Sequence, residues 1–274
     1  MSNRTRTEFY TTQQVADLLG VGVTTVKRWA DAGQLPSMET AGHHRRFLVE
    51  AVERMRANQR LESRAGIDAS LLHPWMVIAV TGSGYKLEAV LLEARDRLGS
   101  WAAVADAVGV ALNTLGEAWA NGTISIADEH LASTNISRTV GRLSHVQPTG
   151  ANAPLCLLAC PEHEEHGLGL ALAELATREA GWQVIPLGTR TPAVEVARKA
   201  RELQVSVLAL SASRASSDSA ALARLEEESS IACDEIGALL VLGGEGAWPT
   251  SPRSGKRVQC FREYQRLLAT RRNI

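Results

Sequence analysis

The residues best suited to chemistry follow a short apolar segment in the second half of the chain. After residues 154–160 comes the run Glu-His-Glu-Glu-His at 162–166, and Gly169 lies three residues beyond it. An imidazole binds a metal through one ring nitrogen, and a nearby carboxylate can hold the other nitrogen. The spacing therefore predicts a metal ligand at His166 that is oriented by Glu164. A solvated acidic loop with ordinary turn glycines is the alternative explanation.

The segment around this run alternates apolar strands with helices. Strands are expected at 154–160, 182–187, 205–210, 238–242 and 258–261, with helices at 168–180, 193–203 and 220–236. This order predicts a parallel sheet covered on both faces, with ligands at the carboxyl ends of its strands.

Two more motifs follow strands of the same sheet. Ser211 and Ser213 come after the third strand, and Gly243-Gly244 comes after the fourth. All of them should therefore lie at the edge that carries Glu164 and His166. Serine hydroxyls could extend the hydrogen-bonded chain from the imidazole, and paired glycines let a bulky group approach bare backbone.

Two cysteines lie within the first expected strand. Cys156 and Cys160 are four residues apart in an apolar run, which places them on one face of that strand. A metal pair is conceivable, but no second pair of ligands follows, so the pattern favours buried core thiols.

Residues 85 to about 146 have a helical period and predict a bundle of three or four helices. Trp119 ends one apolar stripe, and Ser125 opens the next helix, which carries Glu129 and His130. These three side chains could meet across the turn at Asn121-Gly122. The alternative is a core tryptophan and an unrelated surface ion pair.

The first part of the chain predicts two short helices and a wing. Thr11 and Gln14 match a capping box at the start of the first helix, and Gly20-Val21-Gly22 breaks it. A second helix opens near Val23. The residues that it turns outward are polar or basic: Thr24, Thr25, Lys27 and Arg28. This is a helix-turn-helix arrangement, whose second helix fits the major groove of DNA. A solvated face of a small bundle is the alternative.

Basic residues continue beyond these helices. The run Gly42-His43-His44-Arg45-Arg46-Phe47 predicts a small wing anchored by Phe47, with its imidazoles and guanidinium groups along phosphates. Residues 1–60 carry nine Lys or Arg against six acidic residues, a balance of +3. The remaining 20 basic and 24 acidic residues give -4. This asymmetry places a nucleic-acid contact at the N-terminal end.

The composition fits a folded protein of several domains. Of the 274 residues, 45% are hydrophobic and 22% are charged, which excludes a disordered or collagen-like chain. The start has no apolar core for a signal peptide, and no apolar run approaches the roughly 18 residues of a membrane span. A cytoplasmic location is expected.

Residues 10–47 resemble the winged helix-turn-helix of the MerR and excisionase-like regulators, whose wing often reads Gly-His-Arg-Arg-aromatic. The motifs of the second half resemble the cobalamin-binding fold, in which Asp-x-His-x-x-Gly, Ser-x-Leu or a variant, and Gly-Gly occur in this order. Here the first motif is Glu164-x-His166-x-x-Gly169, with Glu in the place of Asp. The resemblance implies that His166 is the lower cobalt ligand, that Glu164 orients it, and that Ser211 and Gly243-Gly244 line the channel for the nucleotide tail.

Trp119, nine residues and then Glu129-His130 resemble the signature of the CarH/LitR-type photoreceptors, in which a helical bundle covers the upper face of adenosylcobalamin. The resemblance implies a light-dependent transcriptional repressor rather than an enzyme. In the dark it would assemble as a homotetramer and bind operator DNA, and it would release the DNA after photolysis. Ala120 stands where relatives have a histidine that takes the upper cobalt position after light. Either His130 or water would take that position here, or the light state of this protein differs from theirs.

The expected architecture is therefore multidomain, α and α/β. A winged helix-turn-helix spans 1–58, a linker 59–75, a capping helical bundle 76–148 and a Rossmann- or flavodoxin-like cobalamin-binding domain 149–274. Two other functions stay open. A regulator could sense cobalamin without light, or the protein could be a corrinoid methyl carrier, which would have no need of a DNA-binding head.

Overall fold

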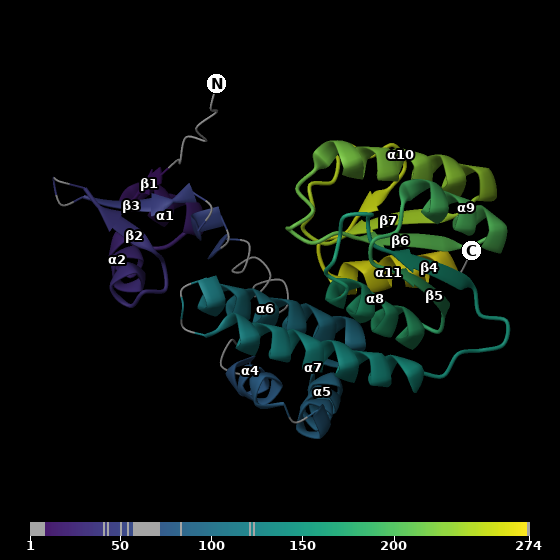
Figure 1. The fold of residues 1–274 in the computed structure, drawn as a ribbon, viewed down its shortest axis with the longest axis horizontal. Coiled ribbons are helices and arrows are strands. Elements are labelled where there is room, and N and C mark those ends of the chain that lie inside the picture. Colours follow the sequence, from purple (N-terminus) through teal and green to yellow (C-terminus); the bar gives the residue numbers. More distant parts are fainter. Residues whose placement is uncertain are drawn as a thin grey trace. The chain divides into compact units, whose positions relative to one another are not determined.

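The computed structural model describes residues 9–40, 42, 44–49, 51–53, 55–56, 72–82, 84–120, 122 and 124–272 (Figure 1). The chain divides into two compact units, with the boundary between Ile67 and Asp68. Most of the segment expected as a linker lies outside the described residues. Its last four residues, however, are the start of a helix, so the helical part begins before residue 76.

The first unit contains a small sheet and two short helices. Its elements are β1 (Phe9–Thr11), α1 (Thr12–Leu19), α2 (Val23–Asp31), β2 (Ser37–Glu39) and β3 (Arg45–Leu48), and the antiparallel sheet has the order β1-β3-β2. Thr11 and Gln14 form the expected capping box, and Gly20 ends α1 in the left-handed conformation. Phe47 is fully buried with Val15 and Val26. The structure thus has the predicted helix-turn-helix followed by a wing.

The second unit begins with four helices. They are α4 (Leu72–Thr81), α5 (Gly84–Leu98), α6 (Trp101–Ala120) and α7 (Ile126–His145). Ser125 caps α7 as the sequence predicts, because its hydroxyl accepts the Asp128 N–H at 3.1 Å. Within the described residues, no helix is both long and apolar enough to cross a bilayer.

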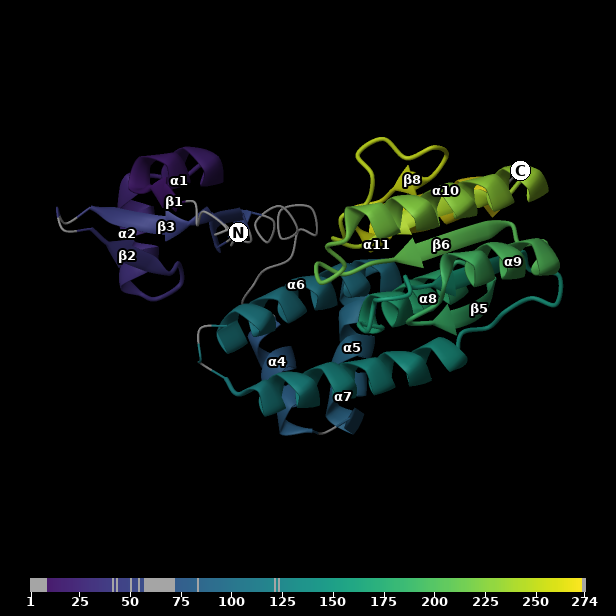
Figure 2. The ribbon, with the colours of Figure 1, turned by 45° about the horizontal axis from the view of Figure 1, so that its top comes forward.

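The rest of this unit is a parallel sheet with helices on both faces (Figure 2). Its elements are β4 (Leu155–Ala159), α8 (Leu168–Glu179), β5 (Gln183–Gly188), α9 (Ala193–Leu203), β6 (Val207–Ser211), α10 (Ser219–Ile236), β7 (Leu239–Gly243), β8 (Lys256–Arg257) and α11 (Phe261–Arg272). The strand order is β5-β4-β6-β7-β8. This confirms the predicted α/β class.

The last expected strand, 258–261, is wrong in position. Residues 256–257 pair with β7 instead, and Phe261 is the first residue of α11. The reason is that Gly255 packs tightly against the side chain of Leu242, which brings the next two residues into the ladder. The N–H of Phe261 then goes to the buried carboxylate of Asp106, at 2.6 Å, rather than to a strand.

Alternation along β4 divides the sheet between its two helical layers. Cys156 and Cys160 share one core layer with residues of α8 and α11, and Leu157 belongs to the opposite layer with α9 and α10. The two cysteines therefore lie on one face, as predicted. Burial raises the pKa of both thiols to about 12. In the described part of the chain, no group of three His, Cys, Asp or Glu residues could hold a metal ion.

Helix α8 joins the bundle to the sheet. Its Leu172 and Leu175 belong to the core of the bundle, while Leu170 faces the sheet. Two carboxylates reinforce this contact. Asp106 of α6 accepts from Arg262 Nε at 3.0 Å, and Glu179 of α8 accepts from Trp101 N at 2.7 Å. The bundle and the sheet are therefore one compact unit.

Candidate functional site

The site is organised around the buried carboxylate of Glu164, in the loop that follows β4. Its Oε1 accepts two hydrogen bonds from His166, one from the backbone N at 2.8 Å and one from Nδ1 at 2.7 Å. Its Oε2 accepts from Ser213 N at 2.7 Å and from Ser216 Oγ at 2.8 Å. The carboxylate thus links the loops after β4 and β6.

These hydrogen bonds fix the charge of Glu164. Burial opposes ionisation of the carboxyl group, but the donors on His166, Ser213 and Ser216 outweigh it and lower the pKa to about 2. An ionised carboxylate can only accept, so Nδ1 of His166 is the donor, and in the neutral tautomer with this proton Nε2 is the nitrogen that can bind a metal. The His166 side chain is 66% exposed, so this nitrogen is available to a metal.

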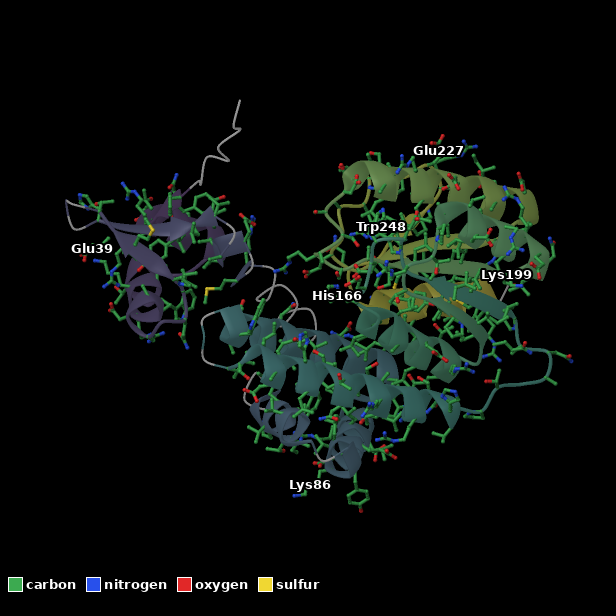
Figure 3. The ribbon with its side chains drawn as sticks, viewed as in Figure 1. Glu39, Lys86, His166, Lys199, Glu227 and Trp248 are labelled. Carbon is green, nitrogen blue, oxygen red and sulfur yellow. The ribbon has the colours of Figure 1, made fainter. Side chains whose placement is uncertain are left out.

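The fold explains why these loops meet. Strands β5 and β6 lie on opposite sides of β4, so the chain changes direction across the sheet between β4 and β6. The loops after β4 and β6 therefore start side by side and then run to opposite faces of the sheet. The crevice between two such loops is the usual ligand position in open α/β sheets. Figure 3 labels His166 near the start of α8, between the sheet and the bundle.

A cavity of about 130 Å³ lies between the sheet and helices α8 and α11. Four of the residues singled out by the sequence line it: Gly169, Ser211, Gly243 and Gly244. Ser213 does not line it. Its Oγ instead lies 3.3 Å from Nδ1 of His166, beside the hydrogen bond between Glu164 and His166 that we call the relay. The structure therefore divides the predicted residues between the Glu164–His166 relay and an apolar cavity.

The glycines serve close approaches of backbone as well as the cavity. Gly244 has φ +80°, and a Cβ there would overlap the carbonyl oxygen of Ala212 in the neighbouring turn. A Cβ on Gly169 would lie 3.0 Å from Ser211 Oγ. Only glycine lets the turns after β6 and β7 approach so closely at residue 244, whereas a side chain at residue 169 would require Ser211 to shift slightly.

The bundle presents the other predicted residues. Trp119, near the end of α6, is 48% exposed. On α7, Ser133 donates to Glu129 Oε1 at 2.6 Å, and Nδ1 of His130 lies 3.1 Å from Glu129 Oε2. The structure thus pairs Glu129 with His130, while Trp119 lies on the preceding helix.

Some of the predicted DNA-contacting residues are exposed, and others bind groups within the first unit. Thr24, Lys27 and Arg28 are exposed on α2, and Thr25 is half-buried. Arg45 instead binds Asp31 at 2.6 Å, which ties the wing to α2.

The remaining wing residues differ in their surroundings. Arg46 is half-buried and donates to the carbonyl of Arg45 at 3.3 Å, and His44 is exposed. His43 lies outside the described residues.

Sequence reasoning missed two groups of site residues. Ser216 holds Glu164, and the third hydroxyl in the run from Ser211 was the available signal. Cys260 and Tyr264 line the cavity from the start of α11. Nothing local marks them, because their position depends on the return of the last helix to the sheet.

The chain matches two known domain families. A helix-turn-helix domain matches residues 9–60, and a B12 binding domain matches residues 78–144, which lie in the bundle. The protein is thus a multidomain α/β protein that combines a helix-turn-helix domain with a B12 binding domain.

Particular relatives agree with this class. The HTH-type transcriptional repressor CarH of Myxococcus xanthus is 38% identical over 106 residues, which are 38% of this chain and 35% of that protein. The repressor CarA of the same organism is 31% identical over 128 residues, 45% of this chain and 42% of that protein. The matched segments therefore span well under half of either relative. These matches confirm the resemblance to CarH-type regulators.

A solved structure shows the same fold for most of the chain. The monomethylamine corrinoid protein of Methanosarcina barkeri superimposes with a TM-score of 0.55 and 13% identity, over 74% of this chain and 99% of that one. At this identity the likeness concerns the fold alone.

The charge of Glu164 should be visible in the stability of the protein. We expect Glu164→Gln to lower the free energy of unfolding by about 1–3 kcal/mol at neutral pH, because buried donors lose a charged acceptor. The pKa is lowered on folding, so this contribution is present above the ordinary pKa, near 4.5, and is lost as the pH falls toward about 2. Urea unfolding of both proteins across this range measures the difference.

The neighbouring Glu165 offers a matched control. It is 72% exposed and pairs with Arg190 at the surface, so Glu165→Gln should change the free energy of unfolding by less than about 0.5 kcal/mol. A gap between wild type and Glu164→Gln that stays constant down to pH 2 would contradict the assignment.

Proposed function

We propose that this protein is a transcriptional repressor that binds adenosylcobalamin and releases operator DNA when light changes the state of that cofactor. The observation that carries the proposal is His166, whose Nε2 is aimed outward by a buried, ionised Glu164 beside an apolar cavity. The same chain carries a helix-turn-helix domain. A ligand site and a DNA-binding element in one chain are the two parts that a ligand-controlled regulator needs.

The described residues fit this cofactor. Nε2 of His166 would hold the cobalt from below, and Glu164 would keep the imidazole in the ligating tautomer. The cavity lined by Gly169, Ser211 and the Gly243-Gly244 turn would take the nucleotide tail. When bound, adenosylcobalamin supplies a cobalt–carbon bond that visible light can break.

The bundle would cover the upper face. Trp119 presents a large, half-exposed ring that can pack against the adenosyl group. Ala120 offers no ligand after that group leaves. Glu129, itself held by Ser133, lies 3.1 Å from Nδ1 of His130. This pairing would leave Nε2 of His130 able to ligate, so either His130 or water would take the upper position.

Loss of a group the size of a nucleoside would remove the packing partner of Trp119 and change the packing of the bundle. A packed interface with two discrete arrangements converts such a loss into a change of assembly. We propose that the dark form is a homotetramer. One small winged head binds DNA weakly, and several linked heads gain effective concentration.

Spectra and DNA binding test the whole proposal. Purified protein with adenosylcobalamin should shift an operator fragment in the dark and release it after green light, with a changed absorption spectrum. His166→Ala should abolish or severely weaken cobalamin binding, because the ligand and its relay are lost together. His163→Ala is the control. His163 is exposed and lies three residues before His166, and Glu164 pairs with His166 instead.

Each contrary result has a distinct meaning. Equal DNA binding before and after light favours a light-independent cobalamin sensor. Cobalamin binding without any DNA binding favours a corrinoid carrier. Unchanged cobalamin affinity in His166→Ala rejects the assigned ligand.

The exposed cations of α2 should contact DNA directly. Arg28→Ala is expected to weaken DNA binding and to reduce the slope of log affinity against log salt by about one, because one phosphate contact is lost. The same change at Arg198, an exposed residue of α9 paired with Glu195, should leave the slope unchanged. Binding titrations at several salt concentrations compare the two variants. Equal slopes for Arg28→Ala and wild type would remove α2 from the interface.

Trp119 should couple the cofactor to assembly. Truncation of a packed aromatic side chain costs about 3–5 kcal/mol, which is roughly two or more decades in an association equilibrium. Trp119→Ala should therefore still bind cobalamin through His166 but run as a smaller species on size-exclusion chromatography in the dark. Tyr85→Ala removes another exposed aromatic, on α5, and should assemble normally. Full dark assembly of Trp119→Ala, with dissociation in light, would place the switch elsewhere.

A further inference from the structure

The cavity beside the relay is hollow because small residues face each other across it. On the sheet, Leu158, Ala209 and Val241 lie side by side in register, and the alanine leaves a gap between two larger side chains. On α8, Gly169 and Ala173 are one helical turn apart and also line the cavity. A cavity of about 130 Å³ is close to the roughly 150 Å³ of an apolar cavity that binds benzene, so it has room for a flat ring.

The inner wall of this cavity is apolar. Leu158, Leu170 and Val258 line it and belong to the core layer between the sheet and helices α8 and α11. The backbone groups of the strands beneath it form hydrogen bonds with one another in the parallel sheet. A ligand group that enters therefore meets aliphatic side chains on several sides.

Tyr264 is the large polar side chain of the wall, and its hydroxyl group donates its proton within the protein. Thr177 Oγ1 donates to the carbonyl of Ala173 at 2.6 Å, so the Tyr264 hydroxyl, 2.8 Å away, donates to Thr177. Its oxygen lies 3.5 Å from the thiol of Cys156. Tyr264 therefore has no proton to offer a ligand.

The other polar side chains of the wall lie nearer to solvent. Ser211 ends β6 at the edge of the sheet, Gln259 is exposed, and Cys260 is half-buried with a weakly hydrogen-bonding thiol. Among the described residues that line the cavity, the inner wall therefore has no side-chain donor for a polar ring nitrogen, and its side-chain acceptor for an amine is the Tyr264 oxygen beside the Cys156 thiol.

We infer that this cavity selects corrinoids whose lower nucleotide carries an apolar benzimidazole base and discriminates against those that carry a purine. The inference rests on the proposed function, because it takes the cavity as the site of the nucleotide tail. A benzimidazole places a hydrocarbon edge against the aliphatic wall. A purine of similar size would bury ring nitrogens that find no side-chain donor there, which costs binding. The relay at His166 is the same for both, so discrimination comes from the cavity.

Binding of three adenosylated corrinoids to the full chain in the dark tests this inference. The ligands are cobalamin, its analogue with adenine as lower base, and cobinamide, which lacks the nucleotide. Isothermal titration should give cobalamin an affinity at least about 10-fold above that of the adenine analogue. The adenine analogue should bind little better than cobinamide.

Variants of the cavity separate its role from that of the relay. Ala173→Leu fills the hollow and should reduce cobalamin affinity toward that of cobinamide, with the affinity for cobinamide unchanged. Ala209→Ser adds a hydroxyl to the floor and should narrow the ratio between cobalamin and the adenine analogue. Ala200→Ser makes the same exchange at a buried position of α9 on the other face of the sheet and should leave the ratio unchanged.

The outcomes distinguish the inference from the proposal beneath it. Equal affinities of wild type for cobalamin and the adenine analogue overturn the selection of the base and leave cobalamin binding intact. Unchanged cobalamin affinity in a folded Ala173→Leu variant overturns the placement of the tail. Failure of all three corrinoids to bind overturns the proposed function itself.

Discussion

One buried charge holds the site together. A carboxylate with 1% exposure must find donors within the protein, because an unpaired charge in the core would be strongly destabilising. Glu164 obtains them from two loops that belong to different strands, and so the loops after β4 and β6 cannot separate without exposing that charge. The tautomer and direction of His166 follow from this constraint. The strands place the two loops at one edge of the sheet, and the Glu164 carboxylate sets the orientation of the His166 ring.

Helix α8 carries the consequences of the site into the bundle. It begins two residues after His166, its Gly169 faces Ser211, and its Leu172 and Leu175 are part of the bundle core. Buried Asp106 and half-buried Glu179 add hydrogen bonds between the same layers. In the proposed function, a change at His166 would therefore have a short, densely packed route to α6 and α7.

Local patterns predicted the elements well, and contacts between distant segments were the harder part. Apolar periodicity predicted most helices and strands, but not α4, which begins in the segment expected as a linker. The two-residue spacing of Glu164 and His166 sufficed to pair them. The edge strand was misplaced because Gly255 and Asp106 decide where α11 begins. Ser216 and Tyr264 act through neighbours 52 and 87 residues away in the chain, so no local pattern reports them. Arg45 looked free for phosphate because its partner Asp31 belongs to another element.

The combination of the relay with the cavity narrows the kind of ligand that fits. A single imidazole does not hold a bare metal ion, and no group of three His, Cys, Asp or Glu residues in the described part of the chain could complete a coordination shell. A metal held at His166, as proposed, would bring most of its ligands with it. The apolar cavity next to it has room for an extended organic group on the same molecule. A macrocyclic metal complex with a long tail, such as the proposed corrinoid, meets both demands.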